Sequence, residues 1–290
     1  KILVMNDGKE GGSKKGHVDS YLYLRKIQLY NLFLDIYGFS TDIASIITGY
    51  DDDWAFEAEI LIKKLHESKL KIKSVEDMKV LPALDLSSRS ISTIPRRLGS
   101  LLIGLKCLNL SKNELTQLPS SVGNLRNLTV LNLSQNCLKS VPSSVFYLNS
   151  LKVLDLYGNQ IRTIPPEIQM LSGSLIVLKA NFNKIKFVPK NIKKLRLLQE
   201  LDLSDNEITT VSAQAFCAPR LKYLHLDHNR IKHLPRLKPA EIKAASSLKR
   251  LVVDSNLSGD PTVRIVREAG TFVSHQHIST RTTLTYLWRK

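Results

Sequence analysis

The sequence predicts an α/β solenoid, in which short units stack and each adds one strand to a parallel sheet on the concave side. Three observations predict this fold. One leucine pattern recurs between residues 81 and 256, apolar and polar residues alternate in the middle of each copy, and an asparagine returns at one fixed position. A unit this short has too few apolar side chains to bury its own face, so the copies must stack.

The recurring pattern is L-x-x-L-x-L-x-x-N-x-L, and eight copies of it follow one another. Asn113, Asn136 and Asn159 hold the asparagine position in three of them, whereas the first copy has Arg89 there. The copies start 23 to 27 residues apart, at Leu81, Leu105, Leu128, Leu151, Leu175, Leu198, Leu221 and Leu248. Repeat positions are counted below from these leucines.

The pattern resembles the leucine-rich repeat. In six copies a proline follows the next apolar residue, as in Ile94-Pro95 and Leu118-Pro119, which resembles the intracellular Ras-group variant of the repeat. The resemblance covers residues 81–256 and implies a right-handed horseshoe with a parallel concave sheet. In this family, repeat positions 3, 5, 7 and 8 face the concave side.

The residues that recur at the same position of each copy are expected to play the same structural role in every copy. Alternation around positions 4 and 6 is typical of a half-buried strand, so the leucines there point into the core and their neighbours point outward. The asparagine amide is expected to hydrogen-bond backbone groups where the strand turns away. Stacking would align these amides in a ladder.

The regions outside the repeats are expected to be a tail and two caps. Residues 1–16 are rich in glycine and polar residues, which predicts a flexible tail. Residues 17–79 show helical spacing, with Trp54, Ala58, Leu61 and Leu65 on one face, and form a helical domain or cap. Residues 257–290 form a C-terminal cap, with a helix from Asp260 to about Ala269 and strand-like cover from 271 onward.

Part of the helical region is also similar to a ubiquitin-associated domain. The similarity rests on the segment 38–44, on Thr48-Gly49 and on the segment 55–57; Tyr37 stands where that family has methionine. Two interpretations therefore stay open for residues 17–79: a cap over the first repeat, or a ubiquitin-linked adaptor.

The net charge of the chain is +16, and the excess belongs to the repeats. Residues 81–256 hold 25 basic and 11 acidic groups, whereas residues 1–80 hold 12 and 13. The concave positions reverse this balance, because they carry seven acidic groups (Asp155 and Asp202 among them) and three basic ones, Lys112, Lys179 and Arg250. The two faces are therefore expected to have different partners.

The concave face is predicted to bind a protein. Aromatic side chains and charges on a rigid curved sheet make good binding anchors. The candidate residues are Tyr157, Phe182, Asp202, Asp205, Tyr223, His225, Asp227, His228 and Asp254. Asp202 should neighbour His225, and Asp205 should neighbour His228. No metal site is assigned, because ligands on an open solenoid surface fan out.

The basic residues are predicted to form a stripe along one edge. Position 12 reads Lys139, Arg162, Lys186, Thr209 and Lys232 in successive copies. At about 5 Å per strand, this row would be about 20 Å long. It suits an acidic protein surface or the backbone of RNA. The candidate basic edge is Lys139, Arg162, Lys184, Lys186, Lys190, Lys193, Lys194, Arg196, Arg230 and Lys232.

The sequence favours a binding protein over an enzyme, with no cofactor or small-molecule substrate. It contains no phosphate-binding glycine loop, nucleophile elbow or zinc-protease helix. The primary expectation is a protein-interaction scaffold, a subunit of a larger assembly, with its basic edge on an acidic surface. The alternative is an RNA-contacting subunit of a ribonucleoprotein particle such as a ribosome.

The cysteines and the hydropathy bear on location. Cys107, Cys137 and Cys217 are an odd, scattered set without a cysteine-rich cap, which favours a reducing intracellular compartment. The cytoplasm is expected first, and an organelle matrix stays open. No apolar run approaches 18 residues, so no membrane-spanning helix is expected.

Overall fold

The computed structural model describes residues 79–94, 96 and 98–275. The predicted tail, nearly all of the predicted helical region with its similarity to a ubiquitin-associated domain, and residues 276–290 of the predicted C-terminal cap lie outside these residues.

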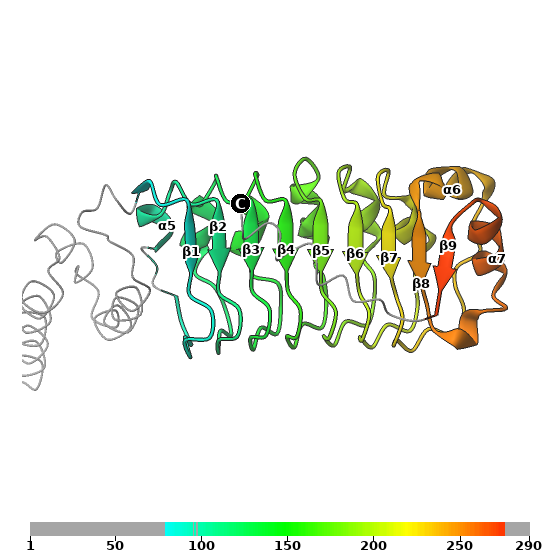
Figure 1. The fold of residues 1–290 in the computed structure, drawn as a ribbon, viewed down its shortest axis with the longest axis horizontal. Coiled ribbons are helices and arrows are strands. Elements are labelled where there is room, and N and C mark those ends of the chain that lie inside the picture. The colour runs from blue at the N-terminus through cyan, green and yellow to red at the C-terminus, as the bar shows by residue number, and fades with distance from the viewer. Residues whose placement is uncertain (1–78, 95, 97, 276–290) are drawn as a thin grey trace, which may run out of the picture.

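The described chain forms one open sheet of nine parallel strands whose order in space follows their order in sequence (Figure 1). The sequence prediction of a solenoid with a parallel sheet is confirmed. The strands are β1 (Ala83–Asp85), β2 (Cys107–Asn109), β3 (Val130–Asn132), β4 (Val153–Asp155), β5 (Val177–Lys179), β6 (Glu200–Asp202), β7 (Tyr223–His225), β8 (Arg250–Val252) and β9 (Phe272–Ser274).

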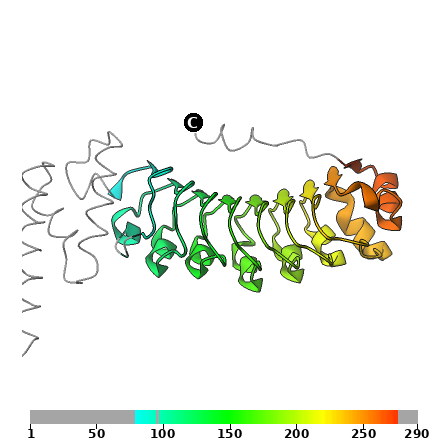
Figure 2. The same ribbon diagram turned by 90° about the horizontal axis from the view of Figure 1, so that it is seen from below.

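Among the described residues, short helical turns cover one face of the sheet, and no helix lies on the other face (Figure 2). They are α5 (Leu98–Leu101), η1 (Ser120–Asn124), η2 (Ser143–Tyr147), η3 (Pro166–Leu171), η4 (Lys190–Lys194), η5 (Ala213–Cys217), α6 (Pro239–Ala244), η6 (Ala245–Ser247), η7 (Ser255–Leu257) and α7 (Pro261–Glu268), where η is a 3₁₀ helix. The repeated proline explains where four of them start. A proline in an extended conformation directly precedes each of η1 to η4, namely Pro119, Pro142, Pro165 and Pro189. The proline ring fixes φ, which helps to end the preceding segment there.

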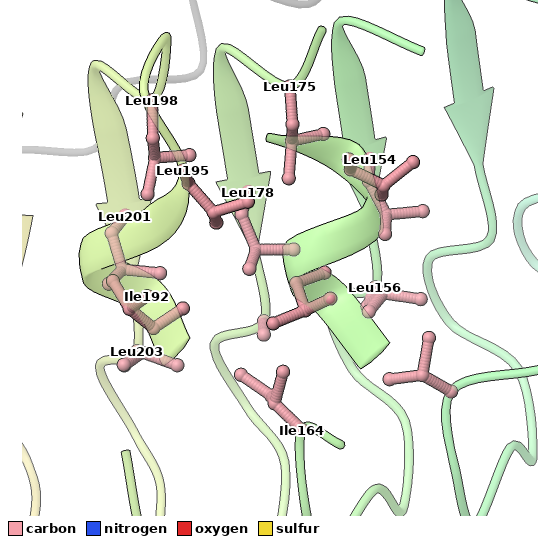
Figure 3. Packing of buried hydrophobic residues seen from close by; sticks show 14 of the residues in the cluster. Leu154, Leu156, Ile164, Leu175, Leu178, Ile192, Leu195, Leu198, Leu201 and Leu203 are labelled. Atoms are coloured by element: carbon pink, nitrogen blue, oxygen red, sulfur yellow. The ribbon is translucent and has the colours of Figure 1, made fainter. Parts of the chain in front are cut away.

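The core lies between the sheet and this helical layer. Leu154, Leu178 and Leu201 occupy position 4 of neighbouring repeats and are fully buried. Figure 3 shows them stacked in line, with Leu195 and Ile192 of the helical side packing toward them. Because every repeat places the same side chain at the same height, each leucine packs between those of the repeats on either side.

The repeated asparagines form the expected ladder. The Asn159 Oδ1 accepts a hydrogen bond from the Leu138 N–H at 3.0 Å. Its Nδ2 donates to the Leu133 carbonyl of the preceding repeat at 3.0 Å and to the Leu156 carbonyl of its own at 3.1 Å. Asn113, Asn136, Asn183, Asn206 and Asn229 make the same two kinds of bond. Each asparagine therefore ties two repeats together.

The residue before each ladder asparagine adopts a left-handed backbone conformation, which the sequence analysis did not predict. Gly158 has φ of 65°, but Gln135, Phe182 and His228 adopt the same region with φ of 53° to 54°. This conformation is unfavourable for residues that have a Cβ. Backbone bonds between repeats hold it in place; for example, the Gln135 N–H donates to the Tyr157 carbonyl at 2.6 Å.

The repeat changes character after β8, and the sheet continues beyond it. Asp260 caps α7 by accepting a bond from the Thr262 N–H at 2.8 Å, as the sequence predicts for a helix starting there. β9 then pairs in parallel with β8, although the eight-copy pattern ends at Asn256. The ninth strand carries no leucine pattern, but it lies where the sequence analysis expects strand-like cover, from residue 271 onward.

The direction of the leucines gives a first testable prediction. Leu154→Ala should lower the free energy of unfolding by about 2–5 kcal/mol, because it empties a fully buried site in a central repeat. Lys152→Ala, at an exposed position two residues earlier, should cost less than about 0.5 kcal/mol. Urea denaturation of both variants measures the difference. Equal midpoints would contradict the assigned directions.

Candidate protein-binding face and basic edge

The sheet face opposite the helices is built from four rows of side chains. Strand register aligns position 3 of every repeat in one row and position 5 in a second row. Positions 7 and 8 follow where the strands end and form the carboxyl edge of this face. Side chains at equal positions lie one strand spacing apart, about 4.8 Å.

The position-3 row contains an apolar strip that the sequence analysis missed. Val130, Val153 and Val177 contact one another in β3, β4 and β5, with Cys107 beside them. They belong to a cluster separate from the leucine core. The signal in the sequence is a valine in three successive copies at a position that faces outward.

The position-5 row contains buried charged and polar side chains. Asp155, Lys179, Asp202 and His225 follow one another in β4 to β7, and all four are buried. The Lys179 Nζ lies 3.8 Å from the Glu200 Oε1 in the neighbouring row. Asp202 and His225 are strand neighbours, as predicted. Asp202 also accepts bonds from Ser204, at 3.1 Å from the N–H and 2.7 Å from the hydroxyl.

The carboxyl edge brings four of the predicted residues within reach of a partner. The rings of Tyr157 and Phe182 meet edge to face with centroids 5.3 Å apart, and Phe182 is 51% exposed. Along the same edge, His228 Nδ1 lies 3.2 Å from Asp227 Oδ2 and 3.8 Å from Asp205 Oδ1. We call Tyr157, Phe182, Asp205 and His228 the carboxyl-edge cluster.

The other predicted concave residues are placed differently. Tyr223 is exposed but lies in the position-3 row, between Glu200 and Arg250, away from the carboxyl-edge aromatics. Asp227 and His225 are each only 1% exposed. The Asp254 carboxylate accepts the His228 N–H at 2.6 Å and the Asn229 N–H at 3.2 Å, so it finishes the last repeat instead of facing a partner.

The basic row is aligned by backbone contacts between repeats. The Arg162 N–H donates to the Lys139 carbonyl, and the Lys186 N–H to the Arg162 carbonyl, each at 3.4 Å. Lys139, Arg162, Lys186 and Lys232 are all exposed, as are the flanking Lys184 and Arg230.

The remaining basic candidates do not share this edge. Lys190, Lys193 and Lys194 belong to η4, in the layer of helices on the other side of the core, and Arg196 follows them. The candidate basic residues therefore form two surfaces, the position-12 row and a group at η4.

Burial changes the acidity of one carboxyl on the concave face. Desolvation raises the pKa of Asp155 from 3.8 to about 6, and Asp202 and Glu200 add to the rise by repulsion. A bond from the Tyr157 N–H at 2.9 Å and the nearby Lys179 charge oppose it. Because the folded state holds this proton more tightly than the unfolded state does, the free energy of unfolding falls as pH rises from about 4 to about 6.

This pH dependence can be tested by replacing Asp155 with asparagine, the residue found at the same position of the neighbouring strand β3. Asp155→Asn copies Asn132, its neighbour in register, and retains an oxygen for the Tyr157 N–H. The variant should be more stable than the parent at pH 7, by at most about 3 kcal/mol, and about equally stable near pH 4. Urea denaturation between these pH values measures it. Asp85→Asn, at the exposed equivalent position of β1, is the control. Equal stability of Asp155→Asn and the parent at pH 7 would contradict the shift.

The residues that the structure describes contain no group of three or more His, Cys, Asp or Glu side chains arranged to hold a metal ion. Within the same residues, no helix has the length and hydropathy to cross a membrane. Cys107, Cys137 and Cys217 are free and partly buried, and burial raises the pKa of the Cys107 and Cys217 thiols.

Known structures share this fold. An LRR protein of Leptospira interrogans is 28% identical, with a TM-score of 0.50 over 69% of this chain and 62% of that one. A TDR receptor is 26% identical, with a TM-score of 0.53 over 62% of this chain and 32% of its own. The structure of PEPR1–AtPEP1 is 26% identical, with a TM-score of 0.51 over 67% and 28%. This chain thus spans less than two thirds of each of these relatives.

Comparison with curated proteins found no match. Two family models match the sequence: a leucine-rich repeat region over residues 62–184, and a leucine rich repeat over residues 174–231 and 196–257. Together they run through the whole of the repeated region, and the repeats they describe are the ones that the sheet, the leucine core and the asparagine ladder display. The chain belongs to the leucine-rich repeat family.

Proposed function

We propose that this protein is a non-enzymatic interaction scaffold, a subunit of a larger assembly, whose carboxyl-edge cluster binds a basic or mixed segment of a protein partner. The observation that carries the proposal is the Tyr157–Phe182 pair beside Asp205 and His228 on a rigid edge. This aromatic pair, in which Phe182 is exposed and Tyr157 is half-buried, offers apolar contact area with little conformational entropy to lose. The adjacent Asp205 carboxylate favours a positively charged neighbour.

The fold supports the general role. Leucine-rich repeats are interaction modules, and PEPR1–AtPEP1, with the same fold, pairs two named components. The finer features of the proposal rest on this chain's own residues. The carboxyl edge is acidic although the repeats as a whole carry a net charge of +14, so a basic segment is drawn to it and away from the rest of the surface.

Replacing two aromatic residues of the carboxyl-edge cluster by alanine tests this site. The full chain would be used as bait in native extract treated with nuclease, and the captured proteins would be quantified by mass spectrometry. Tyr157→Ala with Phe182→Ala should lose the specific partner, since truncating such anchors costs about 2 kcal/mol or more. Tyr147→Ala with Phe187→Ala removes the same two ring types from exposed sites elsewhere and should retain it. Equal capture by both double variants would contradict the site.

For the second surface, we propose that the basic row docks on an acidic surface of the assembly. RNA is the alternative candidate, and the alignment of Lys139, Arg162 and Lys186 by backbone contacts favours it, because evenly spaced cations can follow a phosphate backbone. An acidic protein does not require that regular spacing, so the salt dependence of RNA binding separates the two.

Fluorescence anisotropy with a structured RNA hairpin, across a salt series, tests the basic row. If four to six phosphates are contacted, the log–log slope of affinity against salt should be roughly −3 to −5. Reversing Lys139, Arg162, Lys186 and Lys232 to Glu should abolish binding with little loss of stability. The matched control reverses the four charges at Lys190, Lys193, Lys194 and Arg196. Absence of RNA binding at low salt would leave only the acidic protein surface, and loss only in the control would move the site to η4.

A further inference from the structure

One phenylalanine breaks the polar pattern of the edge that carries the basic row. Phe187 occupies position 13 of its repeat, and it is 58% exposed. The other six of the first seven copies have a polar residue at this position: Thr93, Gln117, Ser140, Thr163, Thr210 and His233. The solenoid therefore does not need an aromatic ring here, and the ring makes little contribution to the core because most of it faces solvent.

The backbone between repeats holds Phe187 among smaller neighbours. Phe187 forms a parallel bridge with Thr210 of the next repeat. Directly before it, the Lys186 N–H donates to the Arg162 carbonyl of the preceding repeat at 3.4 Å. The position-13 residues on either side, Thr163 and Thr210, are both exposed and much shorter than phenylalanine. The ring therefore projects beyond its neighbours and can receive a flat ligand.

Cations surround this ring at positions 10 and 12 of the same four repeats. They are all exposed: Arg162, Lys184, Lys186, Arg230 and Lys232. Glu207 is the only carboxylate at these positions of the four repeats, and it lies between Lys184 and Arg230 in the position-10 row. At about 4.8 Å per repeat, the cations lie within about 10 Å of Phe187 along the stack. Surfaces that bind single-stranded nucleic acid combine such cations, which hold phosphates, with an aromatic ring that stacks on a base.

The ring favours RNA with unpaired bases over the other ligands that cations attract. In a duplex, each base face is covered by the next base pair, whereas the bases of loops and single strands can stack on an aromatic side chain. An acidic protein surface would satisfy the cations, but a densely charged surface offers little apolar area to the ring of Phe187. A base flanked by phosphates satisfies both the ring and the cations.

We propose that Phe187 stacks on an unpaired base of an RNA whose phosphates lie on the basic row to either side of it. The proposal rests on the RNA alternative for the basic row, and it specifies which part of the RNA is bound, a loop or a single strand. Because Phe187 carries no charge, it sets the preference for unpaired RNA without changing the number of phosphates that the row neutralises.

Fluorescence anisotropy of the full chain with two RNA probes tests the stacking. One probe is an oligouridine of about 12 nucleotides, a length within the range of known single-strand sites, and the other is a blunt RNA duplex of the same length. Phe187→Ala should weaken binding of the oligouridine about 5- to 100-fold. It should leave both the log–log salt slope for that probe and the affinity for the duplex unchanged.

Three further variants separate stacking from other effects of the substitution. Phe187→Trp should retain the affinity for oligouridine, whereas Phe187→Leu, which is apolar but not aromatic, should lose it as Phe187→Ala does. Tyr147→Ala removes an exposed ring from η2, on the helical side, and should have no effect. Melting curves should show that all the variants are folded, since changes at exposed positions cost little stability.

The outcomes distinguish this proposal from the one on which it rests. If neither probe binds the parent chain at low salt, the basic row does not bind RNA, and both proposals fail in favour of an acidic protein surface. If the probes bind with a steep salt dependence but Phe187→Ala binds oligouridine as the parent does, only the stacking proposal is overturned. Equal losses for oligouridine and duplex would also contradict stacking.

Photo-cross-linking gives an independent readout of position. Oligouridine that contains 4-thiouridine would be irradiated in complex with the full chain, which is then digested with trypsin. Because trypsin cleaves after lysine, Lys186 and Lys190 delimit a short peptide that contains Phe187. The nucleotide should be found on this peptide, 187–190, and an excess of unmodified oligouridine should remove it. Cross-links found only on η4 would place the RNA on the helical side and overturn the proposal.

Discussion

The asparagine ladder is the interaction on which this fold depends. A strand of three residues makes too few backbone bonds to fix its own direction, and the chain must turn sharply at its end. Each ladder asparagine offers one acceptor and two donors, and it uses them on backbone groups of both its own repeat and the previous one, as Asn159 does with Leu138, Leu133 and Leu156. Burial of the leucines makes stacking favourable, but apolar contacts are not directional. The asparagine amide makes directional hydrogen bonds, and these set the rotation and register from one repeat to the next.

Register in turn decides the chemistry of the concave face. Because equivalent positions align, the residues at one repeat position form one row of side chains in space. Such a row brings together charged residues that are far apart in the chain. Asp155, Lys179 and Asp202 are adjacent only for this reason. Burial of the Asp155 carboxylate costs free energy, as its raised pKa indicates.

The sequence predicted what is strictly periodic and missed what depends on neighbours. The core leucines, the ladder and the pairing of Asp202 with His225 follow from counting residues, since each repeat presents them identically. The valine strip was missed because each valine alone looks like an ordinary strand residue. Strand-like cover was expected from residue 271, where β9 lies, but its parallel pairing with β8 could not be predicted because β9 has no leucine pattern. Spacing along the chain groups Lys193 and Lys194 with the basic residues of one connection, but it does not give the side of the core on which η4 lies.

The left-handed residues before the ladder asparagines have a consequence for how this protein can change. Phe182, Asp205 and His228 all stand in that conformation, where glycine, as at position 158, would be less strained. The side chains best placed to meet a partner are thus held in backbone that stability alone would give to glycine. Selection for a more robust solenoid and selection for recognition pull these positions in opposite directions. A version of this protein that had lost its partner would be expected to acquire glycine at these positions first. Its solenoid would become more stable as its ability to bind a partner was lost.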